Sequence, residues 1–127
     1  MQVACPPGGE DAGRRFYGEG LGLTEVDKPA GLAGRGGVWF RSLGPDGTVT
    51  AELHVGVVEP FAPARKAHPA FLLSDDATLE QVVRRLVGLG YDVDRGEEHT
   101  FPGYRRVHTG DAHGNRVELL ALSLIHI

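Results

Sequence analysis

The 127-residue sequence predicts an α+β fold in which one βαβββ unit is used twice. Two segments have the apolar spacing of amphipathic helices, and each is preceded by one strand-like segment and followed by three. The 19 glycines are spread along the chain, as expected for turns between short elements. A chain of this length holds one domain with a hydrophobic core, so we expect both units to share a single domain.

The clearer of the two helices is predicted over residues 75–90. Its apolar residues recur at helical spacing, and they are Leu79, Val82, Val83, Leu86 and Leu89. An aspartate at its start can cap the first turn, and Gly88 and Gly90 end it. A second helix is predicted over residues 9–22, where Phe16 faces inward and glycines again mark the end.

Eight strands are predicted around these helices. In the first unit they are residues 1–6, 23–27, 36–42 and 49–58. In the second unit they are residues 68–74, 91–96, 104–109 and 115–122. A segment rich in Pro and Ala separates the units. We therefore divide the chain into module one (1–58), a connector (59–67) and module two (68–121).

Matching features recur at a nearly constant spacing, as a duplicated unit requires. The Leu-Gly pair that ends the first helix, residues 21–22, returns as residues 89–90, an offset of 68. Glu52 in the last strand of the first unit returns as Glu118 in the last strand of the second, an offset of 66. A loop difference of two residues accounts for the gap, so the two halves are interpreted as one unit used twice.

Strand alternation separates a helix-facing side from an open side in each unit. In the last strand the apolar residues at 117, 119 and 121 share one side, and Glu118 points the other way. In the fourth strand Glu52 and His54 likewise turn away from the helix. In the fifth strand His68 takes the open side. Polar groups are therefore expected on the open face of both units.

Two interpretations fit these polar groups. A divalent cation would satisfy Glu52, Glu118 and His68 together, because an uncompensated carboxylate in an apolar setting is costly. Alternatively, both glutamates are solvent-facing residues on half-exposed antiparallel strands, and His68 begins a strand near water. The alternation alone does not choose between a metal site and a solvated face.

The sequence also resembles the vicinal oxygen chelate superfamily along essentially its whole length. The resemblance rests on the segments RRFYGEGLGL, KAHPAFLL and DAHGNRVELL. It implies that the two curved mixed sheets wrap a cavity holding a divalent metal ion, either zinc, nickel, iron or manganese. It further implies that His68 and Glu118 are metal ligands and that Glu52 is another, with His54 as a nearby substitute.

Both ends of the chain carry expectations of their own. Superfamily members draw a histidine from the first strand of each unit, and the helix-end offset places that position immediately before Met1. We therefore expect an upstream-extended chain to have histidine there. Residues 122–127 match the translation of a transposon end used in preparing sequencing libraries. We expect them to be a non-native tail, exclude His126 as a ligand and place the domain at residues 1–121.

The resemblance implies a glyoxalase-like lyase or isomerase. In such an enzyme the metal chelates vicinal oxygens of a small substrate and stabilises an enolate-type intermediate, with Glu52 or Glu118 as the catalytic base. Two alternatives stay open. An extradiol-type dioxygenase would use the upstream histidine, His68 and Glu118 around ferrous iron. A metal-free binding protein, like those that bind bleomycin, would use the cavity alone.

Substrate contacts and partners complete the expectations. Trp39, Arg41 and Tyr104 are predicted to bind the substrate. The formal charge of −4 comes without a basic stripe, which argues against nucleic-acid binding. No window is apolar over the length that a membrane span needs, so we expect a cytoplasmic protein with no membrane partner. The resemblance also implies a homodimer.

Overall fold

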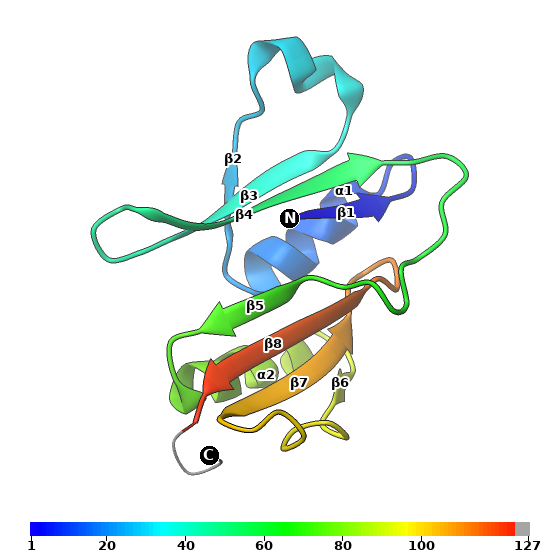
Figure 1. Cartoon of the computed structure of the whole chain (residues 1–127). Helices are drawn as coiled ribbons and strands as arrows, with labels where there is room; N and C mark the ends of the chain where they lie inside the picture. Colours follow the sequence, from blue (N-terminus) through cyan, green and yellow to red (C-terminus); the bar gives the residue numbers. More distant parts are fainter. Residues whose placement is uncertain (124–127) are drawn as a thin grey trace.

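The computed structural model describes residues 1–123 and contains two four-stranded sheets, each backed by helical segments (Figure 1). The first half comprises β1 (Gln2–Cys5), α1 (Glu10–Gly13), η1 (Arg14–Gly20), β2 (Thr24–Val26), η2 (Ala30–Arg35), β3 (Val38–Leu43) and β4 (Val49–Val57). The second half comprises β5 (Ala70–Leu73), α2 (Asp76–Gly88), β6 (Val93–Asp94), β7 (Tyr104–Gly110) and β8 (Arg116–Leu122). All eight predicted strands and the helix predicted over residues 75–90 are confirmed, the helix predicted over residues 9–22 differs in type, and η2 is an additional short 3₁₀ segment.

The two sheets have the same strand order, which confirms the α+β class and the repeated βαβββ unit. Sheet one is ordered β1-β4-β3-β2, and sheet two is ordered β5-β8-β7-β6. In each sheet the first strand runs parallel to the last, while the other neighbours are antiparallel. A parallel pair needs a long crossover, and the helix with its two following strands supplies it.

Strand register relates the two halves more directly than the sequence offset does. The backbone amides of His54 and Glu118 make equivalent hydrogen bonds to the first strand of their own sheet, at 2.9 and 3.0 Å. The matching parallel pairs are Gln2 with His54 and Ala70 with Glu118. His54, and not Glu52, is therefore the structural counterpart of Glu118, which corrects the match made from the sequence. The correction is two residues, and a shift of two leaves every side chain on its original face.

The α2 helix covers one face of sheet two with its apolar side. The Asp75 carboxylate accepts a hydrogen bond from Thr78 N at 2.8 Å and caps the helix. The buried residues are Leu79, Val82, Val83 and Leu86, as predicted. The helix predicted over residues 9–22 is instead a single α-turn that continues as the π-helix η1 and buries Phe16 and Tyr17.

The helical segments of the two halves meet at Gly20. A Cβ atom at this position would lie 2.7 Å from Leu86 Cδ2, so a larger residue would displace a fully buried leucine. Arg85 Nε donates to Gly20 O at 2.9 Å, and Arg15 Nη2 donates to Leu89 O at 2.7 Å. These contacts pack η1 against α2 and so join the backs of the two sheets.

A buried turn between β7 and β8 ties together the seam where the edge strands β1 and β5 face each other (Figure 1). Asp111 Oδ2 accepts from Tyr17 Oη at 2.7 Å and from Asn115 Nδ2 at 2.9 Å. Asn115 Nδ2 also donates to Ala4 O at 2.7 Å, and Ala64 N donates to Asn115 Oδ1 at 3.0 Å. One turn of the second half thus holds η1, β1 and the connector.

The structure describes the first two residues of the expected non-native tail, Leu122 and Ser123. Leu122 ends β8, and the amide of Ser123 donates to Gly103 O at 2.8 Å. The rest of the expected non-native tail, residues 124–127 with His126, lies outside the described residues. Across residues 1–123, no helix combines the length and apolar character needed to cross a membrane.

Candidate metal centre

Three side chains converge on the open face of sheet two. They belong to His68, His108 and Glu118, and one ligand atom from each lies within 4.8 Å of the other two. His108 and Glu118 are directly opposite each other in the β7–β8 ladder, and Ala70 pairs with Glu118 from the β5 side. His68 stands two residues before Ala70, so alternation turns it to the same face. The fold therefore brings together two ligands predicted from the sequence and one that was not.

Both imidazoles direct a nitrogen at the same carboxylate oxygen. Glu118 Oε1 lies 3.0 Å from His68 Nε2 and 3.3 Å from His108 Nε2. His68 Nδ1 is 2.7 Å from the carbonyl oxygen of Lys66, so this nitrogen carries a hydrogen. His68 Nε2 is then the nitrogen that faces the carboxylate, at 3.0 Å, either as a protonated donor to Glu118 Oε1 or with a cation between the two atoms.

Burial and charge adjust the ionisation of this cluster. Glu118 and His108 are each 6% exposed. Burial alone would raise the pKa of Glu118, but the hydrogen bond with His68 and the charge of Arg106 outweigh it, so the pKa is lowered. Burial and the charge of Arg116 lower the pKa of His108 against the opposing effect of Glu118. Both shifts favour the carboxylate and neutral imidazole forms that metal ions bind.

A divalent cation fits this donor set. Metal–ligand bonds of about 2.0–2.2 Å at tetrahedral or octahedral angles separate neighbouring ligand atoms by about 2.9–3.5 Å. The two Nε2–Oε1 distances, 3.0 and 3.3 Å, already fall in that range. The alternative that Glu118 faces solvent is wrong, because its side chain is buried.

Glu52 lies apart from this cluster, on the open face of sheet one. Its Oε1 accepts from Arg41 Nε at 3.2 Å and is 3.4 Å from His54 Nε2. The hydrogen bond with His54, followed by the interaction with Arg41, lowers the pKa of Glu52. Its side chain is 36% exposed. Within residues 1–123 it belongs to no group of three ligand residues, so its role and that of His54 as ligands stay predictions.

The predicted substrate-binding residues are divided between the two sheets. Trp39 stacks on His54, with ring centroids 3.6 Å apart and 4° between the planes. Arg41 shares the open face with Trp39, because the intervening Phe40 is buried beneath the helical segment. Tyr104 is the first residue of β7, on the open face of sheet two. Contact of these residues with substrate stays a prediction.

His108 is the cluster member that was not predicted as a metal ligand. The short turn around Asp111 could have predicted the position of His108, because two strands that leave a tight turn pair residue by residue outward from that turn. Counting outward places residue 108 opposite Glu118, as observed. Alternation then puts His108 on the same open face. Pairing the hairpin before assigning ligands would have included this histidine.

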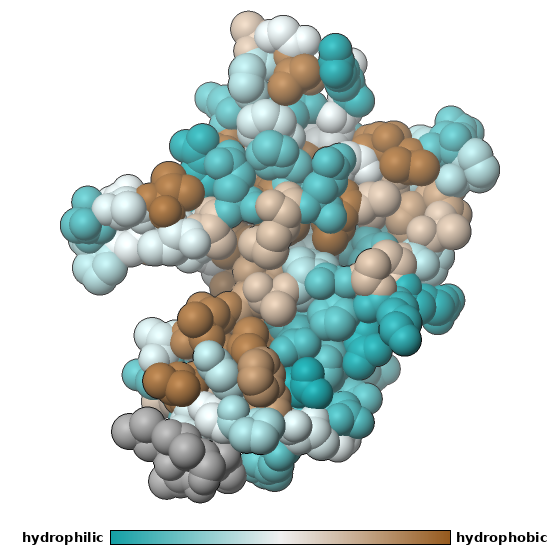
Figure 2. All heavy atoms as spheres, in the orientation of Figure 1, coloured by the Kyte–Doolittle hydropathy of each residue, from teal (hydrophilic) through white to brown (hydrophobic). Residues whose placement is uncertain are grey.

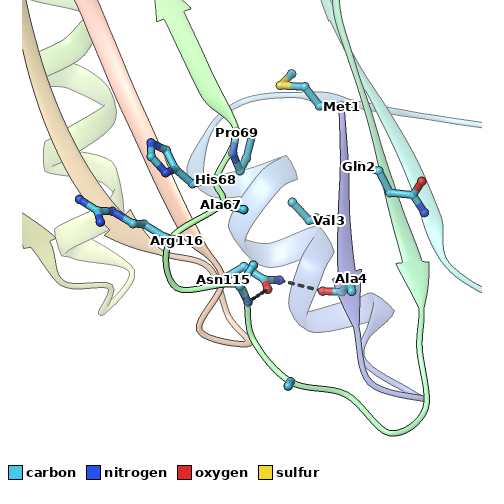
Figure 3. Close-up of a pocket in the computed structure, with 11 residues that line it drawn as sticks. Met1, Gln2, Val3, Ala4, Ala67, His68, Pro69, Asn115 and Arg116 are labelled. Carbon is cyan, nitrogen blue, oxygen red and sulfur yellow. Dashed lines mark hydrogen bonds between the residues drawn. The ribbon is translucent and has the colours of Figure 1, made fainter.

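Two hollows lie along the seam. One has a volume of ≈ 500 Å³ and includes Met1, Val3, His68, Asn115 and Arg116 in its lining (Figure 3). The other, ≈ 480 Å³, includes Leu23, Glu52, Leu72 and Leu119. The structure therefore has a divided hollow where the resemblance implies a single cavity, and one cluster residue, His68, lines the first part of it.

Two repeated βαβββ units with histidine and glutamate ligand atoms on an open sheet face define a duplicated α+β protein with a candidate metal centre. The sequence matches the Glyoxalase/Bleomycin resistance protein/Dioxygenase superfamily over residues 8–119. The match covers most of the chain, so the protein belongs to this superfamily, and the resemblance to vicinal oxygen chelate proteins is confirmed. No curated protein matches the sequence.

Solved structures agree with this assignment. A glyoxalase family protein from Bacillus anthracis is 36% identical, with a TM-score of 0.82 over 96% of this chain and 91% of that one. Lactoylglutathione lyase from Agrobacterium tumefaciens is 23% identical, with a TM-score of 0.65 over 95% and 91%. Fosfomycin resistance protein FosX from Mesorhizobium loti is 19% identical, with a TM-score of 0.64 over 98% and 90%. The last two likenesses concern the fold alone.

Proposed function

We propose that this protein is a glyoxalase-like metalloenzyme in which His68, His108 and Glu118 hold a divalent cation. The observation that carries the proposal is the approach of two imidazole nitrogens to one buried carboxylate oxygen, at 3.0 and 3.3 Å. Three protein ligands leave room on a tetrahedral or octahedral ion for substrate oxygens. When bound, the cation would supply Lewis-acid stabilisation of negative charge that develops on two neighbouring oxygens of a small substrate.

The protein's own residues have distinct tasks in this proposal. Lys66 O holds the His68 ring in the tautomer that presents Nε2 to the open face. His108 packs against the carboxylate from β7 and limits its movement. A carboxylate beside the substrate carbon, Glu118 or Glu52, would accept the transferred proton. The pKa of each is lowered from its ordinary value, so both are ionised at neutral pH.

Glu52 requires a particular assembly to take part. In one chain it lies on sheet one and is paired with Arg41. We propose that sheet one of a second copy brings Glu52, Trp39 and Arg41 to the open face of sheet two in a homodimer. Exposed apolar residues on that face, Leu72 at 67% and Leu122 at 54%, support a covering partner, and Figure 2 shows hydrophobic side chains gathered over β5 and β8. Metal affinity should then rise with protein concentration, and an affinity independent of concentration would exclude a shared site.

Two other functions have specific support. Ferrous iron held by His68 and Glu118 would suit an extradiol-type dioxygenase, with the histidine expected before Met1 as third ligand. A metal-free binder is supported by the stacked rings of Trp39 and His54 and by the fold of TnmS3, an antibiotic-binding protein from Streptomyces that is 22% identical with a TM-score of 0.63. Oxygen consumption with catechols would favour the first, and ligand binding without metal the second.

The primary experiment measures metal affinity by competition with a chromogenic chelator. The proteins are wild type, His68→Ala, Glu118→Gln and the control His99→Ala, whose histidine is 57% exposed and outside the cluster. We expect each cluster variant to bind zinc or manganese at least about a hundredfold more weakly, and the control to match wild type. Equal affinity in all four proteins would exclude this metal centre.

The expected upstream histidine is tested in the same assay. The β1–β4 ladder pairs Gln2 with His54, so a residue preceding Met1 would lie level with Glu52. A chain extended by histidine should bind metal more tightly if that histidine is a ligand. Identical affinities with histidine and with alanine at the added position would exclude it.

A further inference from the structure

We propose that Arg106 and Arg116 form an anion-binding subsite beside the cluster, so that the substrate is a small organic anion bearing a carboxylate, phosphate or phosphonate group. The inference rests on the proposed function for the presence of a bound cation, whereas the positions of the two arginines come from the structure itself. Both guanidinium groups belong to the open face of sheet two, on either side of Glu118 along the ladder.

Arg106 is held in place by the loop that precedes β7. Its Nη2 donates to Thr100 Oγ1 at 2.8 Å, and its Nε donates to Glu97 O at 3.3 Å. These bonds leave Nη1 directed at the cluster, 3.6 Å from Glu118 Oε1. The Arg106 side chain is 23% exposed. A guanidinium fixed by its surroundings loses little freedom when it binds an anion.

Arg116 is the less engaged of the two arginines. It is half-buried, and across residues 1–123 no hydrogen bond or ion pair is recorded for its guanidinium. It borders the ≈ 500 Å³ hollow together with His68 and a second, ≈ 390 Å³ hollow together with His108. Figure 3 shows Arg116 at the start of β8 and His68 on the segment that leads into β5, both projecting toward the same side. Its planar set of donors is therefore available to a ligand at the cluster.

The charges around the cluster favour an anion once a divalent cation is present. Among the buried and half-buried groups, Arg106 and Arg116 contribute two positive charges, and Glu118 contributes one negative charge. Three exposed carboxylates also lie nearby: Glu97 is 3.7 Å from Arg106, and Asp92 and Asp94 line the ≈ 390 Å³ hollow with Arg116. Solvent screens these exposed carboxylates more than the buried groups. A bound divalent cation would therefore leave an excess of positive charge among the less exposed groups, and an anionic ligand removes that excess.

The hollow beside Arg116 limits the rest of the ligand. Besides His68 and Arg116, its lining is largely small and apolar, with Ala62, Ala64, Ala67 and Pro69 along one side. Its volume of ≈ 500 Å³ is at the small end of ligand pockets. The expected ligand therefore has one anionic group and a short apolar body.

The test uses sulfate, a dianion that does not titrate near neutral pH, on the full chain at constant ionic strength. Arginine side-chain resonances are followed by NMR during sulfate titrations with and without zinc, and zinc affinity is measured separately. The variants are Arg116→Gln, Arg116→Lys and the control Arg84→Gln, an exposed arginine on α2. Thermal unfolding confirms that each variant is folded.

We expect the Arg116→Gln variant to bind sulfate more weakly without any loss of zinc affinity. Sulfate should bind the zinc-loaded variant about tenfold more weakly, because a charge-assisted hydrogen bond is lost. Zinc should bind the variant as tightly as wild type or up to about tenfold more tightly, because a like charge is removed. Arg116→Lys should keep part of the sulfate affinity, and Arg84→Gln should change neither affinity.

The outcomes separate this inference from the metal centre. Equal sulfate binding by wild type and Arg116→Gln overturns the subsite. Weakening of zinc and sulfate binding together assigns Arg116 to structure and also overturns it. If zinc does not bind at all, yet sulfate binding by the zinc-free protein depends on Arg116, the metal centre fails and the anion subsite stands.

Discussion

The open-face positions at the middle of the ladder hold Gln2, His54 and Trp39 in sheet one, and Ala70, Glu118 and His108 in sheet two. The backbone register is the same in both sheets. In sheet one two rings stack face to face at 3.6 Å, whereas in sheet two two nitrogens meet one carboxylate oxygen. Equivalent positions on one scaffold therefore provide either an aromatic surface or a set of metal ligands.

The comparison of the two sheets also shows which residues the fold needs for its core and which residues can vary. The helix-facing positions are apolar and buried in both sheets, and they include Val38, Leu53 and Val55 in one and Val107, Val117 and Leu119 in the other. These residues supply the core whatever lies on the opposite face. The open-face residues are free to differ in chemistry because the helices do not cover them.

The largest effect is expected at the turn that links the halves. Asp111→Ala would leave Tyr17 Oη and Asn115 Nδ2 without their buried acceptor, so we expect about 3–4 kcal/mol of destabilisation in urea unfolding. The control is Asp46→Ala in the equivalent hairpin turn of sheet one, where an exposed aspartate accepts from Thr48 N at 3.0 Å. We expect less than about 1 kcal/mol there. Similar losses at both turns would mean that the Asp111 turn does not link the halves.

The next effect concerns the counterpart pair His108 and Trp39. His108→Phe makes sheet two resemble sheet one, and we expect zinc affinity to fall about a hundredfold because one of three ligands is lost. Trp39→Phe is the matched change in sheet one and should leave zinc affinity within about threefold of wild type, as a residue outside the ligand set. An unchanged affinity in His108→Phe would reduce the proposed ligand set to His68 and Glu118.

A smaller effect is expected from the aromatic stack itself. Trp39→Ala removes the ring on which His54 lies, and we expect a loss of about 1–2 kcal/mol in unfolding free energy. Zinc affinity at low protein concentration, where single chains prevail, should not change in parallel. If both quantities fell together there, sheet one of the same chain would contribute to the metal site, and the division between the two open faces of one chain would not hold.

The smallest effect is a pH dependence specific to the helix side of sheet two. Arg95 and Arg105 lower the pKa of Glu80, and Arg105 lowers the pKa of Glu98 against the opposing effect of burial. A lowered folded-state pKa stabilises the protein above the unfolded value, about 4.3, and this stability is lost as pH falls through the folded value.

The Arg105→Met variant tests whether the ion pairs of Arg105 cause this loss of stability at low pH. Urea unfolding at pH 7 should show a loss of about 1 kcal/mol, and the further loss between about pH 5 and 3 should be smaller than in wild type. Arg14→Met, which removes the exposed pair with Glu25 on sheet one, should leave the pH profile nearly unchanged. A wild-type slope in Arg105→Met would contradict the assignment.

Periodicity predicted most of the fold because the core strands have apolar residues at alternate positions, which face the helices. The exceptions have physical causes. The π-helical run of η1 packs at Gly20 against α2, which lies far away in the sequence, so local spacing does not reveal this contact. The match of Glu52 with Glu118 failed because a two-residue shift preserves the facing of side chains, so alternation cannot detect it.

The candidate site was predicted in part for similar reasons. His68 and Glu118 were found because they carry the family motifs, while His108 is visible only when the β7–β8 hairpin is paired. Glu52 satisfied the same alternation rule as Glu118, but its ion pair with Arg41 depends on which strands are neighbours. Sequence patterns give the face of each residue, and tertiary pairing decides its partners.

The position of the Asp111 turn has an evolutionary consequence. Its side-chain bonds hold η1, β1 and the connector through Tyr17, Ala4 and Ala64 and make no use of the open-face residues. Mutations that exchange ligands, charges or aromatic rings on either face can therefore accumulate without separating the two halves. The duplicated scaffold therefore tolerates substitutions among the residues that determine which ligand is bound. Selection can change the ligand-binding residues of one half while those of the other half stay the same.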